Sequence, residues 1–334
     1  MVRIVTDITF EGIITDKTYK EVDLFKKFNY SKIHDGRKLI LMKNHETNEN
    51  IGFIIFDKNI LYNIEILDKY KGLKLGSRLL SVFETYAINY YGEVIANNVL
   101  NEEFFFHYDY KPISKKSNNF IFRPKSLDIL LENEINQIQD KKLREFTRMV
   151  LSNVPLFYSV VPSSSTSQFH PVDETYRGGQ VKHFIKTFKM IEHSGRRYGI
   201  NKKIYDVLRV SALLHDVPFK FSIKNLSNKC NCSKECSNYF KCSEYSNIII
   251  KHNKEHPFSN AMYLIRYMSK FKDIKFELSN IINAIYYHMG RWADYDSELA
   301  NSVKKEFPFN EESIFVKCLQ EADYYSTRKN VLVN

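Results

Sequence analysis

The chain has 334 residues, of which 43% are hydrophobic and 26% are charged, and its formal net charge is +10. This length and composition are typical of a folded globular protein with room for two domains, and they exclude a disordered chain. The apolar runs are short and interrupted by charge, and the first residues, MVRIVTDITFEG, include acidic residues and no long apolar stretch. We therefore expect no membrane span and no secretory signal, and we predict a cytoplasmic protein.

Residues 1–125 are expected to form a mixed α/β domain. The segments KLILMK, IGFIIF and ILYNIEIL, between residues 38 and 67, are separated by turn residues and are typical of strands. Apolar residues recur at helical spacing from about Ser77, and EVIANNV (93–99) predicts another strand. The pattern then breaks in KPISKKSNNFIFRPKS (111–126), where we place the domain boundary.

The turn YKGLKLGSRLL (70–80) lies between a predicted strand and a predicted helix. Backbone N–H groups in such a turn, with the helix N-terminus, can hold a pyrophosphate. With its flanking strands, this segment resembles the GNAT acyltransferase family over residues 1–120. The resemblance implies that the turn and the next segment bind acetyl-CoA through Lys71, Gly72, Leu73, Lys74, Leu75, Gly76, Ser77 and Asn101.

Three positions depart from the GNAT pattern. Lys74 stands where the family usually has glycine, Asp109 replaces the glycine of its GF pair, and Phe105 falls at its frequent general-acid tyrosine. Phenylalanine has no hydroxyl with which to protonate a leaving thiolate. Two interpretations therefore stay open for this domain, which are acyl transfer and a role in binding or dimerisation without turnover.

Residues 126–334 are expected to be all-α. The segment LDILLENEINQIQDKKLREFTRMVLSNV (127–154) is amphipathic, and PSSSTSQFHP (162–171) predicts a loop. Further helices are predicted near 178–194, 202–215, 256–270, 276–289 and 311–326. The expected fold class is thus a two-domain α+β protein, with a sheet domain followed by a helical bundle.

Ionisable residues interrupt the apolar faces of these helices. In SALLHDVPFKF (211–221), two such groups end an apolar helix, which costs free energy unless something pairs with them. Four other predicted elements show the same feature, and imidazole with carboxylate suits a divalent transition metal. The residues concerned are His183, His215, Asp216, His256, His288 and Asp323.

The order H…HD…H…H…D resembles the HD-domain metal-dependent phosphohydrolase superfamily over residues 150–330. The resemblance implies one ion (Mn²⁺, Fe²⁺, Ni²⁺ or Mg²⁺) on His183, His215, Asp216 and Asp323, and a second on His256 and His288 with Asp216 bridging. The runs VPSSSTSQFHP and RGGQVKH resemble HD proteins that act on nucleic acids, including the 3′–5′ exoribonuclease type. HDVPFK departs from the common HD-[IV]-G-K, because Lys220 comes one position late.

Metal-activated water would then attack phosphorus, with Asp216 orienting it. Arg291 follows His288 closely and is a candidate for a bidentate contact with a phosphate oxygen. Other candidates for phosphate are His170, Lys182 and Lys186, and candidates for stacking on a base are Trp292 and Tyr324. The alternative for the charged residues is a solvated charge or a loop cap, and for the aromatic residues a place in the core.

Four of the five cysteines lie together in CNCSKECSNYFKC, inside a polar insertion at residues 222–247. A segment with so little apolar content gains stability from a structural Zn²⁺ held by thiolates. The predicted ligands are Cys230, Cys232, Cys236 and Cys242. An iron–sulfur cluster and free or redox-active thiols are the alternatives, and Cys318 is expected in the core.

Positive charge is concentrated in the helical part. Residues 1–125 carry a net +3 and the remainder +7, which suits a polyanion such as nucleic acid, with solubility as the plain alternative. The leading hypothesis is a phosphohydrolase, either a nuclease or a nucleotidase. The alternative is an acetyl-CoA-sensing or N-acyltransferase protein whose HD-like part is regulatory or a nucleotidase. The oligomeric state is left open.

Overall fold

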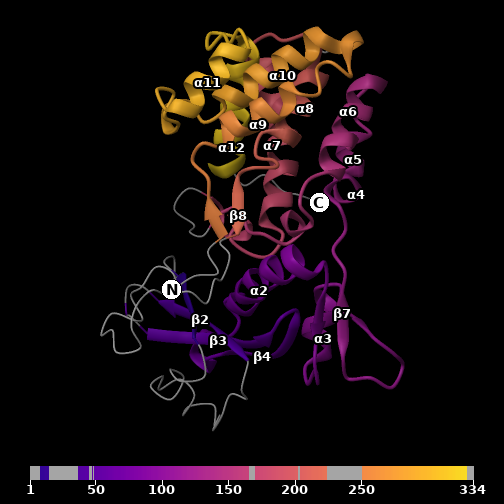
Figure 1. Cartoon of the computed structure of the whole chain (residues 1–334), viewed down its shortest axis with the longest axis vertical. Helices are drawn as coiled ribbons and strands as arrows, with labels where there is room; N and C mark the ends of the chain where they lie inside the picture. The colour runs from indigo at the N-terminus through magenta and orange to yellow at the C-terminus, as the bar shows by residue number, and fades with distance from the viewer. Residues whose placement is uncertain are drawn as a thin grey trace.

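The computed structural model describes residues 8–14, 37–44, 47, 49–164, 170–201, 204–223 and 250–328. Within these ranges the chain is mixed α/β, with an N-terminal sheet followed by a helical bundle, as expected (Figure 1). No helix in the described ranges combines the length and the apolar character needed to cross a bilayer.

The first part is a seven-stranded sheet in the order β1-β2-β3-β4-β5-β7-β6. Its strands are β1 (Ile8–Ile14), β2 (Lys38–Asn44), β3 (Glu49–Asp57), β4 (Ile60–Ile66), β5 (Val94–Ala96), β6 (Lys111–Pro112) and β7 (Phe120–Phe122). β1 to β4 form an antiparallel meander, whereas β4 and β5 pair in parallel through only two residue pairs, Ile60–Ile95 and Leu61–Ala96. The predicted strands are confirmed, but β6 and β7 continue the sheet into the segment that was expected to end it.

Helix α2 (Leu75–Tyr91) lies between the sheet and the bundle (Figure 1). It follows the 3₁₀ turn η2 (Asp68–Tyr70) and ends at Gly92, whose φ of +76° suits glycine. Leu79, Leu80 and Phe83 are fully buried. The polar residue Ser81 on this helix is also fully buried. Its hydroxyl donates to the Val160 carbonyl of the bundle at 2.7 Å, so α2 contacts the bundle on that side.

The bundle begins with short elements. The amphipathic segment predicted as helical breaks into α4 (Leu127–Leu130), α5 (Glu132–Ile135) and α6 (Lys141–Ser152). The Asp140 side chain caps α6 by accepting from the Leu143 backbone N–H at 2.9 Å, which fixes the later start. The preceding α3 spans Glu102–His107, and the 3₁₀ turns η3 and η4 span Leu156–Ser159 and Val172–Glu174.

Five long predicted helices are confirmed with shifted ends. They are α7 (Gly179–Arg197), α8 (Tyr205–Leu214), α9 (His256–Ile265), α10 (Lys275–Tyr287) and α12 (Ile314–Arg328). Four further features were not expected from the sequence. They are α11 (Glu298–Glu306), the 3₁₀ turns η6 (Lys272–Ile274) and η7 (Gly290–Trp292), and the hairpin of β8 (Phe221–Ile223) with β9 (Ile250–His252). That hairpin flanks the cysteine-rich insertion, whose four clustered cysteines lie outside the described residues.

One hydrophobic core runs through both parts. Phe83 of α2, Tyr158 of η3 and Phe184 of α7 belong to the same buried cluster, and Leu127 joins it directly after the sheet. The change of architecture near residue 125 is therefore not accompanied by a gap in the core. The bundle and the sheet hold each other in place, and the ends of the bundle helices converge on the site described next.

Candidate metal centre

The six residues predicted as ligands lie together in the bundle. His183 comes from the first turns of α7, His215 and Asp216 follow the last turn of α8, and His256 begins α9. His288 follows α10 and Asp323 lies on α12. Five of the six are at most 3% exposed, whereas the Asp323 side chain is 21% exposed.

One group of donors gathers around His183 and His215. Their Nε2 atoms lie 3.1 Å apart, and Asp323 Oδ1 lies 3.2 Å from His183 Nε2 and 3.8 Å from His215 Nε2. Asp216 Oδ2 completes the group at 3.4 Å from His215 Nε2. Ligand atoms at about 2.1 Å from a shared cation lie roughly 3.0–3.4 Å from one another, so this donor set fits a single ion.

A second group lies on the other side of Asp216. The Nε2 atoms of His256 and His288 are 3.2 Å apart, and Asp216 Oδ1 lies 3.1 Å from the first and 3.6 Å from the second. The two oxygens of one carboxylate thus face two separate pairs of imidazoles. Imidazole nitrogen and carboxylate oxygen together suit divalent transition metals, so the donors of the second group fit an ion as well.

Backbone carbonyls determine which ring nitrogen of each histidine faces the site. The Nδ1 atoms of His215, His256 and His288 lie 2.9, 2.8 and 2.7 Å from the carbonyl oxygens of Ala212, Asn253 and Ile285. A carbonyl can only accept, so each Nδ1 carries the proton and each Nε2 presents its lone pair to the site. These rings are held in the form that coordinates metal.

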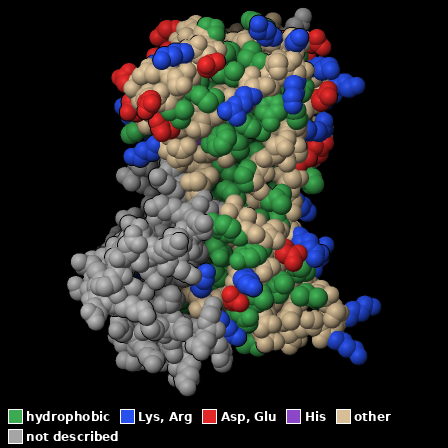
Figure 2. All heavy atoms as spheres, viewed as in Figure 1, with side chains coloured by type: hydrophobic (Ala, Val, Ile, Leu, Met, Phe, Trp, Pro, Cys, Tyr) green, Lys and Arg blue, Asp and Glu red, His purple; other side chains and the backbone are tan. Residues whose placement is uncertain are grey.

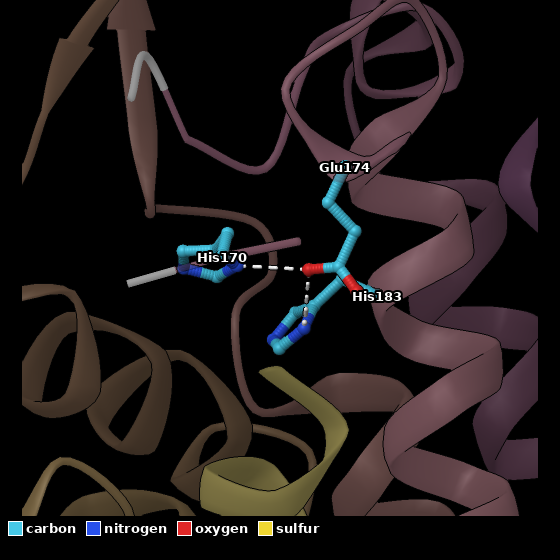
Figure 3. Close-up of side chains that lie close together, drawn as sticks. All are labelled: His170, Glu174 and His183. Carbon is cyan, nitrogen blue, oxygen red and sulfur yellow. Dashed lines mark hydrogen bonds and ion pairs between the residues drawn. The ribbon is translucent and has the colours of Figure 1, made fainter. Parts of the chain in front are cut away.

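His183 is oriented differently, by a carboxylate (Figure 3). Its Nδ1 faces Glu174 Oε2 at 3.4 Å, and the same oxygen lies 2.8 Å from His170 Nδ1. The other oxygen, Glu174 Oε1, forms an ion pair with the Lys186 ammonium at 3.0 Å. Glu174 is fully buried, so it holds His183 and His170 in a fixed relation to each other.

Asp216 is held by side chains that include Lys220, the lysine that comes one position late in HDVPFK. Lys220 is 5% exposed, and its Nζ donates to Asp216 Oδ2 although it comes one position later than in the common motif. Gln180 Nε2 donates to the same oxygen at 2.9 Å. Asn260 donates to the His215 carbonyl and accepts from the Phe219 backbone N–H, which holds the turn after α8.

The charge states follow from burial and from neighbouring groups. Burial lowers the pKa of His215 to about 3 and also lowers the pKa of His256, so both are neutral. Burial opposes the charged form of His183, but Asp323 and Glu174 outweigh it and raise the pKa of His183 to about 9. Burial also opposes ionisation of Asp216, yet the Lys220 ammonium beside it helps to hold the pKa of Asp216 well below the ordinary value.

Glu174, Gln180 and Asn260 were not among the predicted site residues. Gln180 precedes His183 by three residues, so the two share a face of α7, and this spacing was the available signal. Glu174 lies in a 3₁₀ turn and Asn260 pairs with backbone atoms 41 and 45 residues away, for which the sequence carries no local signal.

The predicted phosphate-binding side chains lie in different environments. Lys186 is 3% exposed, and its ammonium lies 3.0 Å from Asp173 and from Glu174, so it is occupied by internal ion pairs. His170 contacts Glu174 through Nδ1, and Lys182 is half-buried next to His183 on α7. Arg291 is exposed in η7.

The predicted acetyl-CoA loop leads into α2. Gly72 and Lys74 have φ of +79° and +57°, Lys71 pairs with Asp68 at 2.7 Å, and Ser77 is 4% exposed. Asn101 caps α3 by accepting from the Phe104 N–H at 3.1 Å. The remaining members of the loop are Leu73, which packs against the core, Leu75, which is buried in α2, and Gly76, where an added Cβ would lie 3.6 Å from the Phe104 ring.

The comparisons with known proteins gave no match: no family model, no curated protein and no solved structure matches this chain.

Proposed function

We propose that the helical part is a metal-dependent phosphohydrolase that cleaves phosphoester bonds of nucleic acid or nucleotides. The observation that carries the proposal is the position of Asp216, whose two oxygens face two imidazole pairs at 3.1–3.6 Å. A carboxylate shared in this way suits two divalent ions held side by side, an arrangement that serves in-line displacement at phosphorus. The motif order H…HD…H…H…D supports the same function.

Bound divalent ions would lower the pKa of a coordinated water and stabilise negative charge on phosphoryl oxygens. The protein residues position the groups around them. Lys220 and Gln180 bind Asp216 Oδ2 and fix the carboxylate, while Glu174 fixes the His183 ring. In the hydrolysis a water oxygen bonds to phosphorus, the P–O ester bond breaks, and a proton from the water passes to the departing oxygen. Arg291 is exposed near His288 and is available to a phosphate oxygen.

The test is incubation of the full chain with Mn²⁺ and a panel of dNTPs, cyclic nucleotides, single-stranded RNA and single-stranded DNA. We expect hydrolysis of at least one class, reduced to background by Asp216→Asn. The matched control is Asp273→Asn, a neutralised carboxylate that is exposed at η6, and it should keep full activity. Absence of hydrolysis by manganese-loaded protein, or activity that survives Asp216→Asn, would refute the proposal.

For the sheet part we propose binding of acyl-CoA without acyl transfer. The loop from Lys71 to Lys74 joins η2 to the start of α2, and β4 separates from β5 after two paired residues. Phe105 is 5% exposed and packs on Tyr110, and because its side chain has no hydroxyl it offers no proton to a leaving thiolate. Calorimetric titration with acetyl-CoA should give saturable heat that Lys74→Ala weakens. No heat at near-millimolar acetyl-CoA would refute it.

A further inference from the structure

Two exposed aromatic side chains with arginines over their rings lie within four residues of two of the candidate metal ligands. Trp292 comes four residues after His288 and is 59% exposed, and the Arg291 guanidinium carbon lies 4.9 Å from its ring centre. Tyr324 directly follows Asp323 and is 51% exposed, with the Arg328 guanidinium carbon 4.3 Å from its ring centre. Among the exposed aromatic side chains of the described ranges, only these two carry such an arginine.

Both pairs lie on the same side of the bundle. Gln320 of α12 donates to the Tyr287 carbonyl at 2.6 Å, and a methyl group added at Gly290 would meet the same amide at 3.5 Å. Tyr324 follows Gln320 by four residues, so it lies one turn further on the same face of α12. Asp323, the most exposed of the six ligands, is the neighbour of Tyr324. We call Arg291, Trp292, Tyr324 and Arg328 the aromatic rim.

The chemistry of the aromatic rim matches nucleobases and phosphates. An exposed aromatic ring can stack on any base, and an arginine beside it can bind the adjoining phosphate. Two such pairs suit successive nucleotides of one strand, whereas a mononucleotide would need only one. The face shown in Figure 2 has basic and acidic side chains interspersed over the described helices, without one dominant basic patch.

We propose that the aromatic rim binds successive nucleotides of a single-stranded nucleic acid next to the metal centre, so that the substrate is an oligonucleotide. That the bound oligonucleotide is a substrate rests on the proposed phosphohydrolase activity, whereas binding to the aromatic rim does not. A single strand carries negative phosphates, and its binding also agrees with the net charge of +7 on residues 126–334.

The chain contains one tryptophan, so fluorescence excited at the long-wavelength edge of the indole band, where its 22 tyrosines absorb little, reports on Trp292. Full-length protein in EDTA is titrated with a thymidine decamer, a uridine decamer and the two mononucleotides. We expect saturable quenching by at least one decamer, and binding weaker by tenfold or more for the mononucleotides. The two decamers distinguish DNA from RNA. Tyr324→Ala should weaken decamer binding about 5- to 150-fold, and Tyr324→Phe should restore it.

Phe276→Ala is the matched control, because Phe276 is 67% exposed at the opposite end of α10 from His288. It should bind as the wild type does. Trp292→Ala is followed by polarisation of a labelled decamer and should show a loss similar to that of Tyr324→Ala. The inference is overturned if neither decamer quenches, if mononucleotides bind equally well, or if Tyr324→Ala has no effect. Decamer binding without manganese-dependent hydrolysis would refute only the proposed activity, and hydrolysis of bis(p-nitrophenyl) phosphate without decamer binding would refute only the rim.

Discussion

The Arg177 guanidinium donates to the Glu84 carboxylate at 2.6 Å and so joins the sheet part to the bundle that carries the candidate metal centre. Glu84 lies on α2 and is fully buried, and its other oxygen accepts from the Tyr110 hydroxyl at 3.0 Å. Arg177 immediately precedes the turn that starts α7, the helix that carries His183. The sheet is thus connected to the candidate metal centre through one buried ion pair and one helix.

Removing one partner of this pair should be strongly destabilising. Arg177→Ala leaves a buried carboxylate without its counter-charge, which costs about 3–5 kcal/mol of unfolding free energy. Arg123→Ala is the control, because Arg123 and Glu93 form an exposed pair that contributes about 0–1 kcal/mol. Urea unfolding of both variants provides the measurement. A loss below about 1 kcal/mol for Arg177→Ala would show that the pair does not stabilise the folded chain as expected.

The loss of unfolding free energy caused by Arg177→Ala should depend on pH. Burial raises the pKa of Glu84 above the ordinary 4.5, although Arg177 and Tyr110 act in the opposite direction. A carboxyl whose pKa is raised by folding contributes stability that is complete below the unfolded pKa and is lost as pH rises through the folded pKa. Without Arg177 the folded pKa rises further, so the destabilisation should be larger at about pH 8 than at about pH 5. Equal losses at both pH values would contradict this.

The number of manganese ions bound by each variant should test whether Asp216 serves two metal sites. Manganese at about 100 times its dissociation constant stabilises the folded chain by about 2.7 kcal/mol per site, visible as a higher Tm. Calorimetry should count about two ions for the wild type and one for Asp323→Asn, because Asp323 faces only His183 and His215. Asp216→Asn should lose both, and Asp273→Asn should lose neither. A single ion in the wild type would show that Asp216 does not serve two sites.

The sequence predicted the candidate ligands better than it predicted the boundaries of the elements. His215 and His288 continue the apolar faces of α8 and α10, so helical spacing alone placed them inward. The strands β6 and β7 are two and three residues long, too short for an alternating pattern to be visible. The break between α5 and α6 also escaped prediction, because the Asp140 cap and its backbone contact to Asp206 depend on tertiary packing.

Thiol reactivity should separate Cys318 from the clustered cysteines. Cys318 is fully buried, and burial raises the pKa of its thiol to about 12, so almost none is present as the reactive thiolate. We expect iodoacetamide at about pH 8 to modify it only after unfolding. The four predicted zinc ligands should instead become reactive when a chelator is added to the folded chain. Mass spectrometry of the labelled peptides measures both, and labelling of Cys318 in the folded chain would contradict the first expectation.

Glu174 and Asp173 offer a matched pair for testing how His183 is held. Both carboxylates contact the Lys186 ammonium at 3.0 Å, but only Glu174 faces His183 Nδ1. A carboxylate behind a ligating histidine orients the ring and raises its basicity, and its loss typically weakens metal affinity 10- to 100-fold. Glu174→Gln should therefore weaken manganese binding by about that factor, measured by competition with a chelator, whereas Asp173→Asn should leave it unchanged. If both variants weakened binding equally, the effect would come from Lys186 and its ion pairs, and the role assigned to Glu174 would be wrong.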